Sequence, residues 1–200
     1  MKVLLEYNKA ELVIKNSRFI AESFPVQSQA AARDKLHELK LKYSDATHVV
    51  HAFIVGKAGE VSGMSDDGEP SGTAGRPVLD VLKGSGITNI LITVTRYFGG
   101  TLLGTGGLVH AYGDSAKEVL SSCKAETFVE KKHFSFSTDY SLYESIKRIY
   151  NNYHIEQYSE EFDTTVSAFG VIYADEASSF CQQVFNMTKG QTEVIITSCI

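Results

Sequence analysis

The chain has 200 residues, a length that suits one large domain or two small ones. Hydrophobic residues make up 43% of it and charged residues 22%, the balance of a folded globular protein, and no apolar run reaches the roughly 20 residues of a membrane-spanning helix. The net charge of −5 is divided unevenly, with +1 on residues 1–125 and −6 on residues 126–200. The second part therefore lacks the basic excess of non-specific nucleic-acid binders, and we expect no membrane partner.

The N-terminus and the cysteines indicate the compartment. The apolar segment near the N-terminus is too short for a signal peptide. Three cysteines, Cys123, Cys181 and Cys199, form an odd set at wide spacings, which is typical of reduced thiols and not of a disulfide framework or a zinc site. We therefore expect a cytoplasmic protein.

The first 55 residues predict three elements. Residues 11–26 have an extended pattern. Ser28 is a suitable helix N-cap, and a helix is expected to follow as far as Tyr43. Its predicted buried side chains, spaced by four, three and four, are Ala32, Leu36, Leu39 and Tyr43. Residues 48–55 are rich in Val, Ile and Phe and predict a strand.

In the middle of the chain, stretches rich in Gly, Pro and other residues that interrupt helices and strands alternate with apolar segments. Residues 60–77 contain many breakers and predict a long loop, followed by a short helix over 78–82 that two glycines end. Residues 89–98 predict a central strand, since they are apolar on both faces. Residues 99–107 predict a turn into a helix that ends near Cys123. The predicted buried stripe of that helix is Leu108, Tyr112, Ala116, Val119 and Cys123.

The pattern resets after a predicted boundary at 124–131. The expected elements are a strand at 133–138, a helix opened by a capping box at 141–144, strands at 155–161 and 165–173, a helix capped by Asp175 and a strand at 194–198. Side chains expected to face inward are Leu142, Ile146, Ile149 and Tyr153 in the first helix and Phe180, Cys181, Val184 and Phe185 in the second. This order is the ferredoxin-like βαββαβ arrangement. We therefore predict an α+β chain with domains at 1–125 and 126–200.

Glycine is concentrated in one part of the chain. Of the 16 glycines, 14 lie between Gly56 and Gly113. Glycine permits positive φ or a close approach of the backbone, at a cost in unfolded-state entropy. The residues between these glycines are Ser, Thr, Asp, Glu, Arg and Tyr, so this stretch is the expected functional surface.

Residues 99–107 follow a strand and open a helix, so their free N–H groups favour an anion, with Arg96 adding charge. Two specific nucleotide-binding motifs do not fit this segment. A P-loop needs Lys where Thr105 stands, and a dinucleotide motif needs Gly where Val109 stands. The alternative is that the glycines serve only packing or a tight turn.

Other candidate sites have simpler explanations. Asp66, Asp67 and Glu69 suit a hard cation, but solvated loop acids or a salt bridge to Arg76 are the better explanation, so we expect no metal and no cofactor. His48 and His51 lie three apart on a strand and point to opposite faces, so they do not chelate one ion. No nucleophile motif is found, and we expect no catalytic residue.

Three segments together resemble the signature of the IMPACT/YigZ family. They are Asp-Asp-Gly-Glu-Pro-Ser-Gly-Thr-Ala-Gly-Arg-Pro at 66–77, Thr-Arg-Tyr-Phe-Gly-Gly at 95–100, and Leu-Gly-Thr-Gly-Gly-Leu-Val at 103–109. The resemblance implies a two-layer N-terminal domain like the second domain of a small-subunit ribosomal protein, with helices on one face of its sheet. It implies a C-terminal domain like the ferredoxin-like domains of elongation factor G. Eukaryotic members are tied to translational control through a protein partner.

The resemblance also implies a set of binding residues. Carried over position by position, they are Asp67, Glu69, Ser71, Thr73, Arg76, Arg96, Tyr97, Gly99, Gly100, Gly106 and Gly107. Two positions depart from the family pattern, because Leu102 and His110 stand where many relatives carry Lys or Arg. The surface is therefore less basic here.

Three functions remain open at this point. The first is a non-enzymatic, translation-linked protein that contacts RNA, the ribosome or a translation-associated protein. The second is an enzyme acting on a small phosphorylated or carboxylated ligand, with His48 or an acid of residues 66–69 as base. The third is a protein–protein interaction module, favoured by the near-neutral first part and the acidic second part. A closed pocket at this surface would favour the enzyme.

Overall fold

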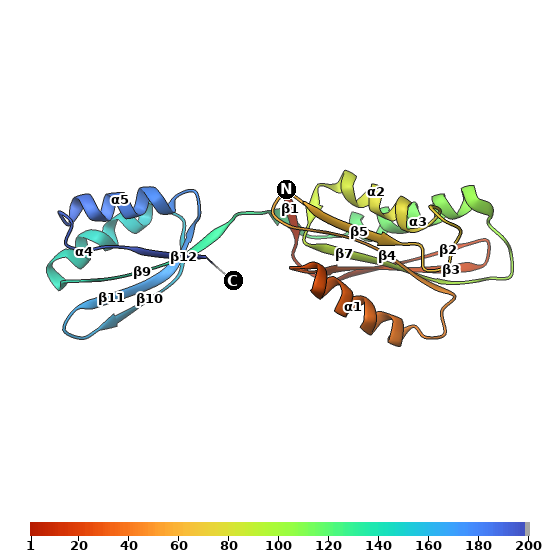
Figure 1. Cartoon of the computed structure of the whole chain (residues 1–200), viewed down its shortest axis with the longest axis horizontal. Helices are drawn as coiled ribbons and strands as arrows, with labels where there is room; N and C mark the ends of the chain where they lie inside the picture. The colour runs from red at the N-terminus through yellow and green to blue at the C-terminus, as the bar shows by residue number, and fades with distance from the viewer. Residues whose placement is uncertain (199–200) are drawn as a thin grey trace. The chain divides into compact units, whose positions relative to one another are not determined.

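A computed structural model describes residues 1–198 of the chain. It has mixed α+β structure, as predicted, in two compact units, Met1–Phe128 and Val129–Ile200 (Figure 1). We call them the N-terminal and the C-terminal unit. Within residues 1–198, no helix has the length and apolarity needed to cross a membrane.

The N-terminal unit is built on an antiparallel sheet. Within the described chain this sheet has five strands, in the order β2 (Asn8–Ile14), β3 (Ser17–Pro25), β7 (Ile90–Tyr97), β4 (His48–Val55) and β5 (Val61–Ser65). The predicted central strand is confirmed, because β7 lies in the middle and is buried along most of its length. A smaller sheet that the sequence pattern did not predict joins β6 (Ile87–Thr88), β1 (Lys2–Leu4) and β8 (Ala125–Thr127).

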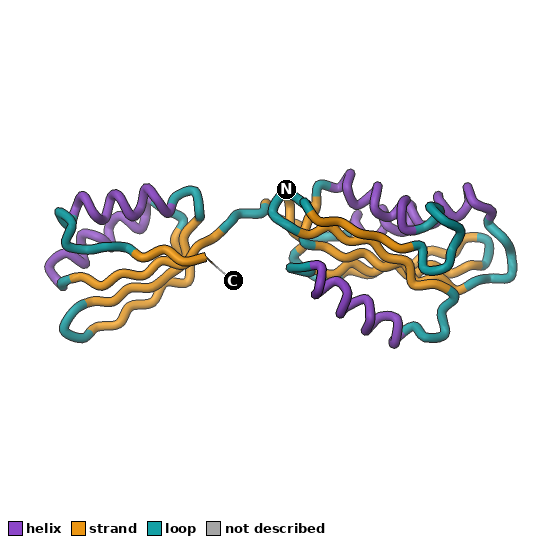
Figure 2. The backbone as a smooth tube through the Cα atoms, viewed as in Figure 1, coloured by secondary structure: helices purple, strands orange, loops and turns teal. Residues whose placement is uncertain are grey.

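Helices pack on both faces of the larger sheet (Figure 2). Helices α2 (Gly75–Ser85) and α3 (Gly104–Ser121) cover one face, and α1 (Gln29–Lys42) covers the other. The expected two-layer arrangement with helices on one face is therefore wrong, because β4 and β7 carry apolar side chains on both faces and α1 covers the second set. The predicted cap of α1 is confirmed, since Ser28 Oγ accepts the N–H of Ala31 at 3.1 Å. Of the expected buried stripe of α1, Ala32 and Leu39 are buried.

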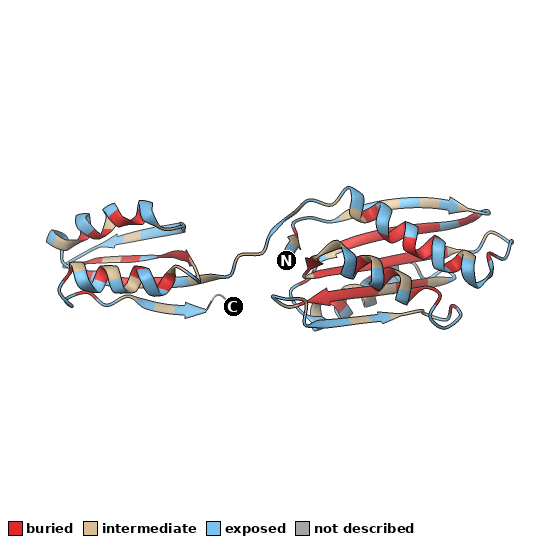
Figure 3. Ribbon diagram, turned by 90° about the horizontal axis from the view of Figure 1, so that it is seen from above, coloured by how far each residue is buried: buried red, intermediate tan, exposed pale blue. Residues whose placement is uncertain are grey.

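The inner strands of this sheet are largely buried, drawn red in Figure 3, and β4 is one of them. The side chains of β4 divide between the two faces. Val50, Ala52 and Ile54 join the core under α2 and α3, whereas Phe53 and Val55 join the smaller core under α1. The alternation follows from the two-residue period of a strand. It also places His48 and His51 on opposite faces, as predicted.

The predicted loop over 60–77 is too long. Strand β5 occupies its beginning, paired with β4, and α2 starts at Gly75, so the loop comprises residues 66–74, called the site loop below. Position 63 of β5 requires glycine, because a Cβ there would lie 2.5 Å from Phe53 Cε1. At the other end of α2, Gly86 is the left-handed C-cap with φ 69°, while Gly84, expected to help end the helix, lies inside it.

The C-terminal unit has the predicted βαββαβ order. Its elements are β9 (Lys131–Thr138), α4 (Tyr140–Ile149), the 3-10 turn η1 (Tyr150–Asn152), β10 (Ile155–Phe162), β11 (Val166–Tyr173), α5 (Ala177–Met187) and β12 (Ile195–Ser198). The antiparallel sheet runs β10-β11-β9-β12. Phe134 and Phe136 of β9 form its core with Ile146 and Phe180 of the two helices.

Local details of the C-terminal unit differ from the prediction. Ser141 lies inside α4 and Asp139 holds the N-cap position, so the predicted capping box is wrong. Glu176, not Asp175, precedes α5, and Phe185 is exposed. In α4, Tyr143 is the buried residue where Leu142 was expected. Cys123 and Cys181 are free thiols within the described residues, and Cys199 lies outside them.

Candidate functional site

A groove opens on the α2–α3 face of the N-terminal unit. Its volume is about 440 Å³. The site loop, the ends of β4 and β7, and the segment that leads into α3 form its walls, and we call it the apolar groove because most of its accessible wall surface is apolar. Its lining residues are Thr47, His48, Gly68, Glu69, Pro70, Arg96, Phe98, Leu102, Leu103, Gly104, Thr105 and Leu108.

The floor of the groove is a buried ion pair. Arg96 Nη1 donates to Glu69 Oε1 at 2.6 Å, and the Tyr112 hydroxyl donates to the same oxygen at 2.7 Å. The two charged side chains are only 3% and 6% exposed. Burial, with the Glu69 carboxylate beside it, raises the pKa of Tyr112 far above its usual range, so its proton stays in place. The charge of Arg96 is therefore neutralised inside the protein.

His48 lies beside this pair. Its Nδ1 is 2.8 Å from the carbonyl oxygen of Asp67. Because a carbonyl oxygen only accepts, Nδ1 carries the hydrogen. The other ring nitrogen, Nε2, lies 3.8 Å from Glu69 Oε2 and at the groove wall. The groove wall therefore includes the Nε2 edge of His48 beside the Glu69 carboxylate.

Asp66 closes the site loop onto α2. Its carboxylate accepts N–H groups from Gly72 at 2.8 Å, Ala74 at 3.1 Å and Gly75 at 2.8 Å. Partial burial alone would raise the pKa of Asp66, but these three donors lower it below its usual value. The expected bridge from this acidic cluster to Arg76 is wrong, because Arg76 pairs with Asp80 at 2.8 Å. Among the described residues no cluster of potential metal ligands occurs.

Asp66→Ala is expected to lower the free energy of unfolding by about 1–2 kcal/mol at pH 7, the usual cost of losing a helix cap. A carboxyl whose pKa is depressed in the fold stabilises it fully above the unfolded-state pKa, about 3.9, and stops doing so as pH falls through the folded value. Urea unfolding from pH 7 to pH 3 should show the difference from the wild type shrinking with acid. Asp66→Asn, which keeps one acceptor oxygen, is the control. A difference that is equal at both pH values would contradict the role of the charge.

Two other predicted site residues, Asp67 and Thr73, stabilise the loop itself. Asp67 has φ 46°, and its carboxylate accepts the N–H of Val49 at 2.7 Å and pairs with Lys40. Thr73 Oγ1 donates to the carbonyl of Pro70 at 2.6 Å. The loop is thus held by contacts within it and by contacts of Asp67 to β4 and α1. Ser71 and Arg76 lie exposed outside the groove.

The residues around β7 divide between the two faces. Arg96 stacks between the rings of Phe19 and Phe98, each 5.5 Å away. The Tyr97 hydroxyl instead donates to Asp45 at 3.0 Å, so Phe98 is the aromatic ring that lines the groove. Of these two neighbouring rings, only Phe98 therefore lines the groove.

The glycines between β7 and the first turn of α3 serve different structural purposes. A Cβ at Gly99 would lie 2.0 Å from the backbone of Asn16, so this position requires glycine for close packing. Gly100 turns the chain with φ 83°. Helix α3 begins at Gly104, earlier than expected, which places Gly106 and Gly107 in its first turn. Among the described side chains none caps this helix, so its positive end faces the groove at Gly104 and Thr105.

Sequence reasoning missed much of the groove wall. The wall residues that it did not assign to the site include Pro70, Leu102, Leu103 and Leu108, and it did not pair Tyr112 with Glu69. One signal was present: two leucines stand between glycines in a loop, and Leu102 proves 82% exposed.

The fold and the groove define a two-unit α+β protein whose glycine-rich motif surrounds a buried ion pair. Residues 15–120 match the profile of the Impact N-terminal domain. The chain belongs to the IMPACT family, which confirms the resemblance drawn from its motif.

Relatives and a solved structure match along most of the chain. The IMPACT family member YvyE of Bacillus subtilis is 34% identical over 198 residues, covering 94% of this chain and 87% of its own. The IMPACT family member YigZ of Escherichia coli is 29% identical, covering 91% and 90%. A crystal structure of a hypothetical protein aligns over 100% of this chain and 97% of its own, with TM-score 0.70 and 27% identity.

Proposed function

We propose that this chain is a non-enzymatic, translation-linked binding protein of the cytoplasm that contacts the ribosome or a protein associated with it through the apolar groove. Family membership supports the link to translation, because the motif resemblance ties eukaryotic members to translational control. The observation that carries the contact is the groove itself, a concave surface at the centre of the family motif.

The charges around the groove favour contact by shape and apolar surface. Arg96 is paired with Glu69 and Arg76 with Asp80, so both arginines already have carboxylate partners. The rim exposes apolar side chains, since Phe98 is 46% and Leu102 82% exposed. An exposed aromatic ring can stack on a base, and an apolar rim can pack against a protein side chain.

Leu102→Ser is expected to weaken ribosome association about five- to tenfold, as truncation of an apolar anchor at an interface does. The fold should not change, because the Leu102 side chain is largely in solvent. Val13→Ser is the matched control, because Val13 is 67% exposed on β2, outside the groove. The measurement is sedimentation of each variant with ribosomes through a sucrose gradient.

RNase treatment and salt separate the possible contacts. Association that is lost after RNase or at moderate salt indicates RNA, and association that persists indicates a protein. Migration of the wild type as a free small protein in every condition would contradict the translation-linked function.

The groove also favours a second candidate, an enzyme or receptor for a small phosphorylated or carboxylated ligand. The surface is hollow, and it brings His48 Nε2 and the start of α3 to one place. A helix N-terminus favours an anion, and an imidazole beside it can serve in acid–base chemistry on that ligand. The other proposed bases, the acids of residues 66–69, are all engaged: Asp66 by three backbone N–H groups, Asp67 by Lys40 and Val49, and Glu69 by Arg96 and Tyr112. His48 is therefore the better choice. A thermal-shift screen with phosphorylated and carboxylated metabolites tests this function.

A further inference from the structure

A row of polar side chains crosses the sheet under α1, on the face opposite the groove. Glu22 of β3 stands directly opposite Thr93 of β7, which stands opposite His51 of β4. Thr95 lies two residues beyond Thr93 and therefore on the same face. Elsewhere on this face α1 covers the apolar cluster of Val26, Ala32, Phe53, Val55 and Leu91.

Four atoms of this row lack partners. The side chains of Glu22, Thr93 and Thr95 are fully buried. Within residues 1–198, no hydrogen-bond partner is found for Glu22 Oε2, Thr93 Oγ1, Thr95 Oγ1 or His51 Nδ1. A buried polar atom without a partner destabilises a fold, and native proteins rarely place several together unless water or a ligand bonds them. In the described part of the chain, the Tyr43 hydroxyl beside Glu22 is buried and unpaired as well. The unpaired atoms together therefore point to an occupant of the row.

The surrounding charges define that occupant as neutral. Glu22 Oε1 already accepts the Tyr7 hydroxyl at 2.8 Å and Lys42 Nζ at 3.2 Å. Another cation would meet Lys40 and Lys42, and an anion would meet Glu22. Burial lowers the pKa of His51, with Lys40 lowering it further and Asp67 opposing, so the ring is neutral at pH 7. The occupant must both donate and accept hydrogen bonds.

We propose that α1 and the sheet enclose a binding site for small neutral hydroxylic molecules, ordered water in the simplest case. The four atoms Glu22 Oε2, Thr93 Oγ1, Thr95 Oγ1 and His51 Nδ1 hold it. A hydroxylic molecule donates to the Glu22 carboxylate and accepts from the threonine hydroxyls, and a buried water makes two to four such bonds. Molecules in this site connect α1 to the part of the sheet that the apolar cluster of this face does not cover.

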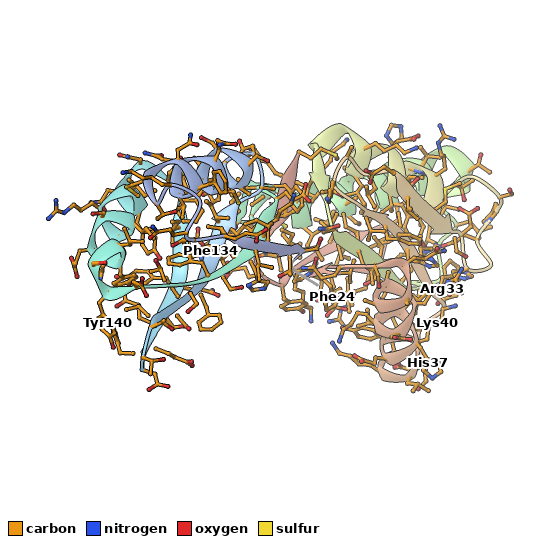
Figure 4. The ribbon with its side chains drawn as sticks, turned by 60° about the vertical axis from the view of Figure 1, so that its left-hand side comes forward. Phe24, Arg33, His37, Lys40, Phe134 and Tyr140 are labelled. Carbon is orange, nitrogen blue, oxygen red and sulfur yellow. The ribbon has the colours of Figure 1, made fainter. Side chains whose placement is uncertain are left out.

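The site is tied to the apolar groove through α1. Lys40, which Figure 4 labels on this helix, pairs with Asp67 of the site loop. The carbonyl of the same Asp67 holds His48 Nδ1 at 2.8 Å. A molecule that holds α1 against the sheet therefore also supports the loop that orients His48, so occupation of the site stabilises the groove.

Thr93→Val and Thr95→Val test the site, because valine replaces the hydroxyl with a methyl group of the same shape. Each variant is expected to raise the unfolding equilibrium constant about fivefold, or about 1 kcal/mol, the worth of one hydrogen bond. Thr88→Val is the matched control, since the buried Thr88 hydroxyl donates to the Gly56 carbonyl at 2.7 Å. Urea unfolding of the full chain gives the three constants. Greater stability of Thr93→Val and Thr95→Val than of the wild type would overturn the proposal.

A high-resolution crystal structure provides an independent test. Ordered density that bridges at least two of the four atoms supports the site, and crystals grown with and without glycerol distinguish water from a larger hydroxylic ligand. Direct hydrogen bonds among Glu22, Thr93, Thr95 and His51, with no molecule between them, would overturn it.

Discussion

Glu69→Ala is expected to lower the free energy of unfolding of the N-terminal unit by about 3–5 kcal/mol, the usual cost of breaking a buried ion pair from one side. The substitution leaves Arg96 charged, 6% exposed and without its carboxylate. It also removes the acceptor of the Tyr112 hydroxyl, which is buried in the same core. Chemical denaturation of the full chain measures the change, with amide exchange in β7 as the local readout.

Two further variants show whether the cost arises from burial. Asp80→Ala removes the partner of Arg76 in a pair whose side chains are 61% and 53% exposed, and should cost under about 1 kcal/mol. The double variant Glu69→Leu/Arg96→Met removes both charges and should recover much of the loss, because apolar replacements of buried pairs are often neutral. A loss of under about 1 kcal/mol for Glu69→Ala would contradict the buried pair.

The sequence predicted well those elements whose structure is determined by residues close together in the chain. Strand β7 begins with three consecutive apolar residues, Ile90, Leu91 and Ile92, which put apolar side chains on both faces and mark the strand as central without information on its partners. The N-cap of α1 is a serine followed by helical spacing, and it forms as expected. The βαββαβ order of the C-terminal unit follows from the same periodicities. In each case the physical cause lies within about a dozen residues.

The elements that were missed depend on distant partners. Strand β5 is rich in small and polar residues, and its pairing with β4 makes it a strand. The cap of α2 comes from Asp66, nine residues before Gly75, because the site loop folds back on itself. Periodicity along the chain does not report such contacts.

The candidate site was located from the sequence, but its chemistry was not. The motif identified the correct stretch, and Glu69 and Arg96 both line the groove. These two residues, 27 positions apart in the sequence, pair with each other. The charge of Arg96, which was expected to face a ligand, is therefore neutralised inside the core. The apolar rim formed by Phe98 and Leu102 was not visible either, because exposure of a leucine depends on the fold around it.

Phe134→Ala is expected to destabilise the C-terminal unit by about 3–5 kcal/mol, the usual cost of removing a buried aromatic ring. Phe134, labelled in Figure 4, is 2% exposed and packs edge-on against Phe180 at 5.2 Å and Tyr150 at 6.0 Å. Position 170 requires glycine, because a Cβ there would lie 2.6 Å from this ring. Truncation of Phe134 to alanine therefore leaves a cavity lined by the backbone at Gly170, which cannot easily move in to fill it.

Hydrogen exchange resolved by unit gives the measurement and tests the domain division predicted from the sequence. Each unit has a core of its own, so Phe134→Ala should speed exchange in β9 and β11 and leave β7 unchanged, with the reverse for Glu69→Ala. Phe169→Ala is the matched control, because Phe169 lies in β11 but is 42% exposed and should cost under about 1 kcal/mol. Faster exchange in β7 after Phe134→Ala would show that the two units unfold together, against the proposed domains at 1–125 and 126–200.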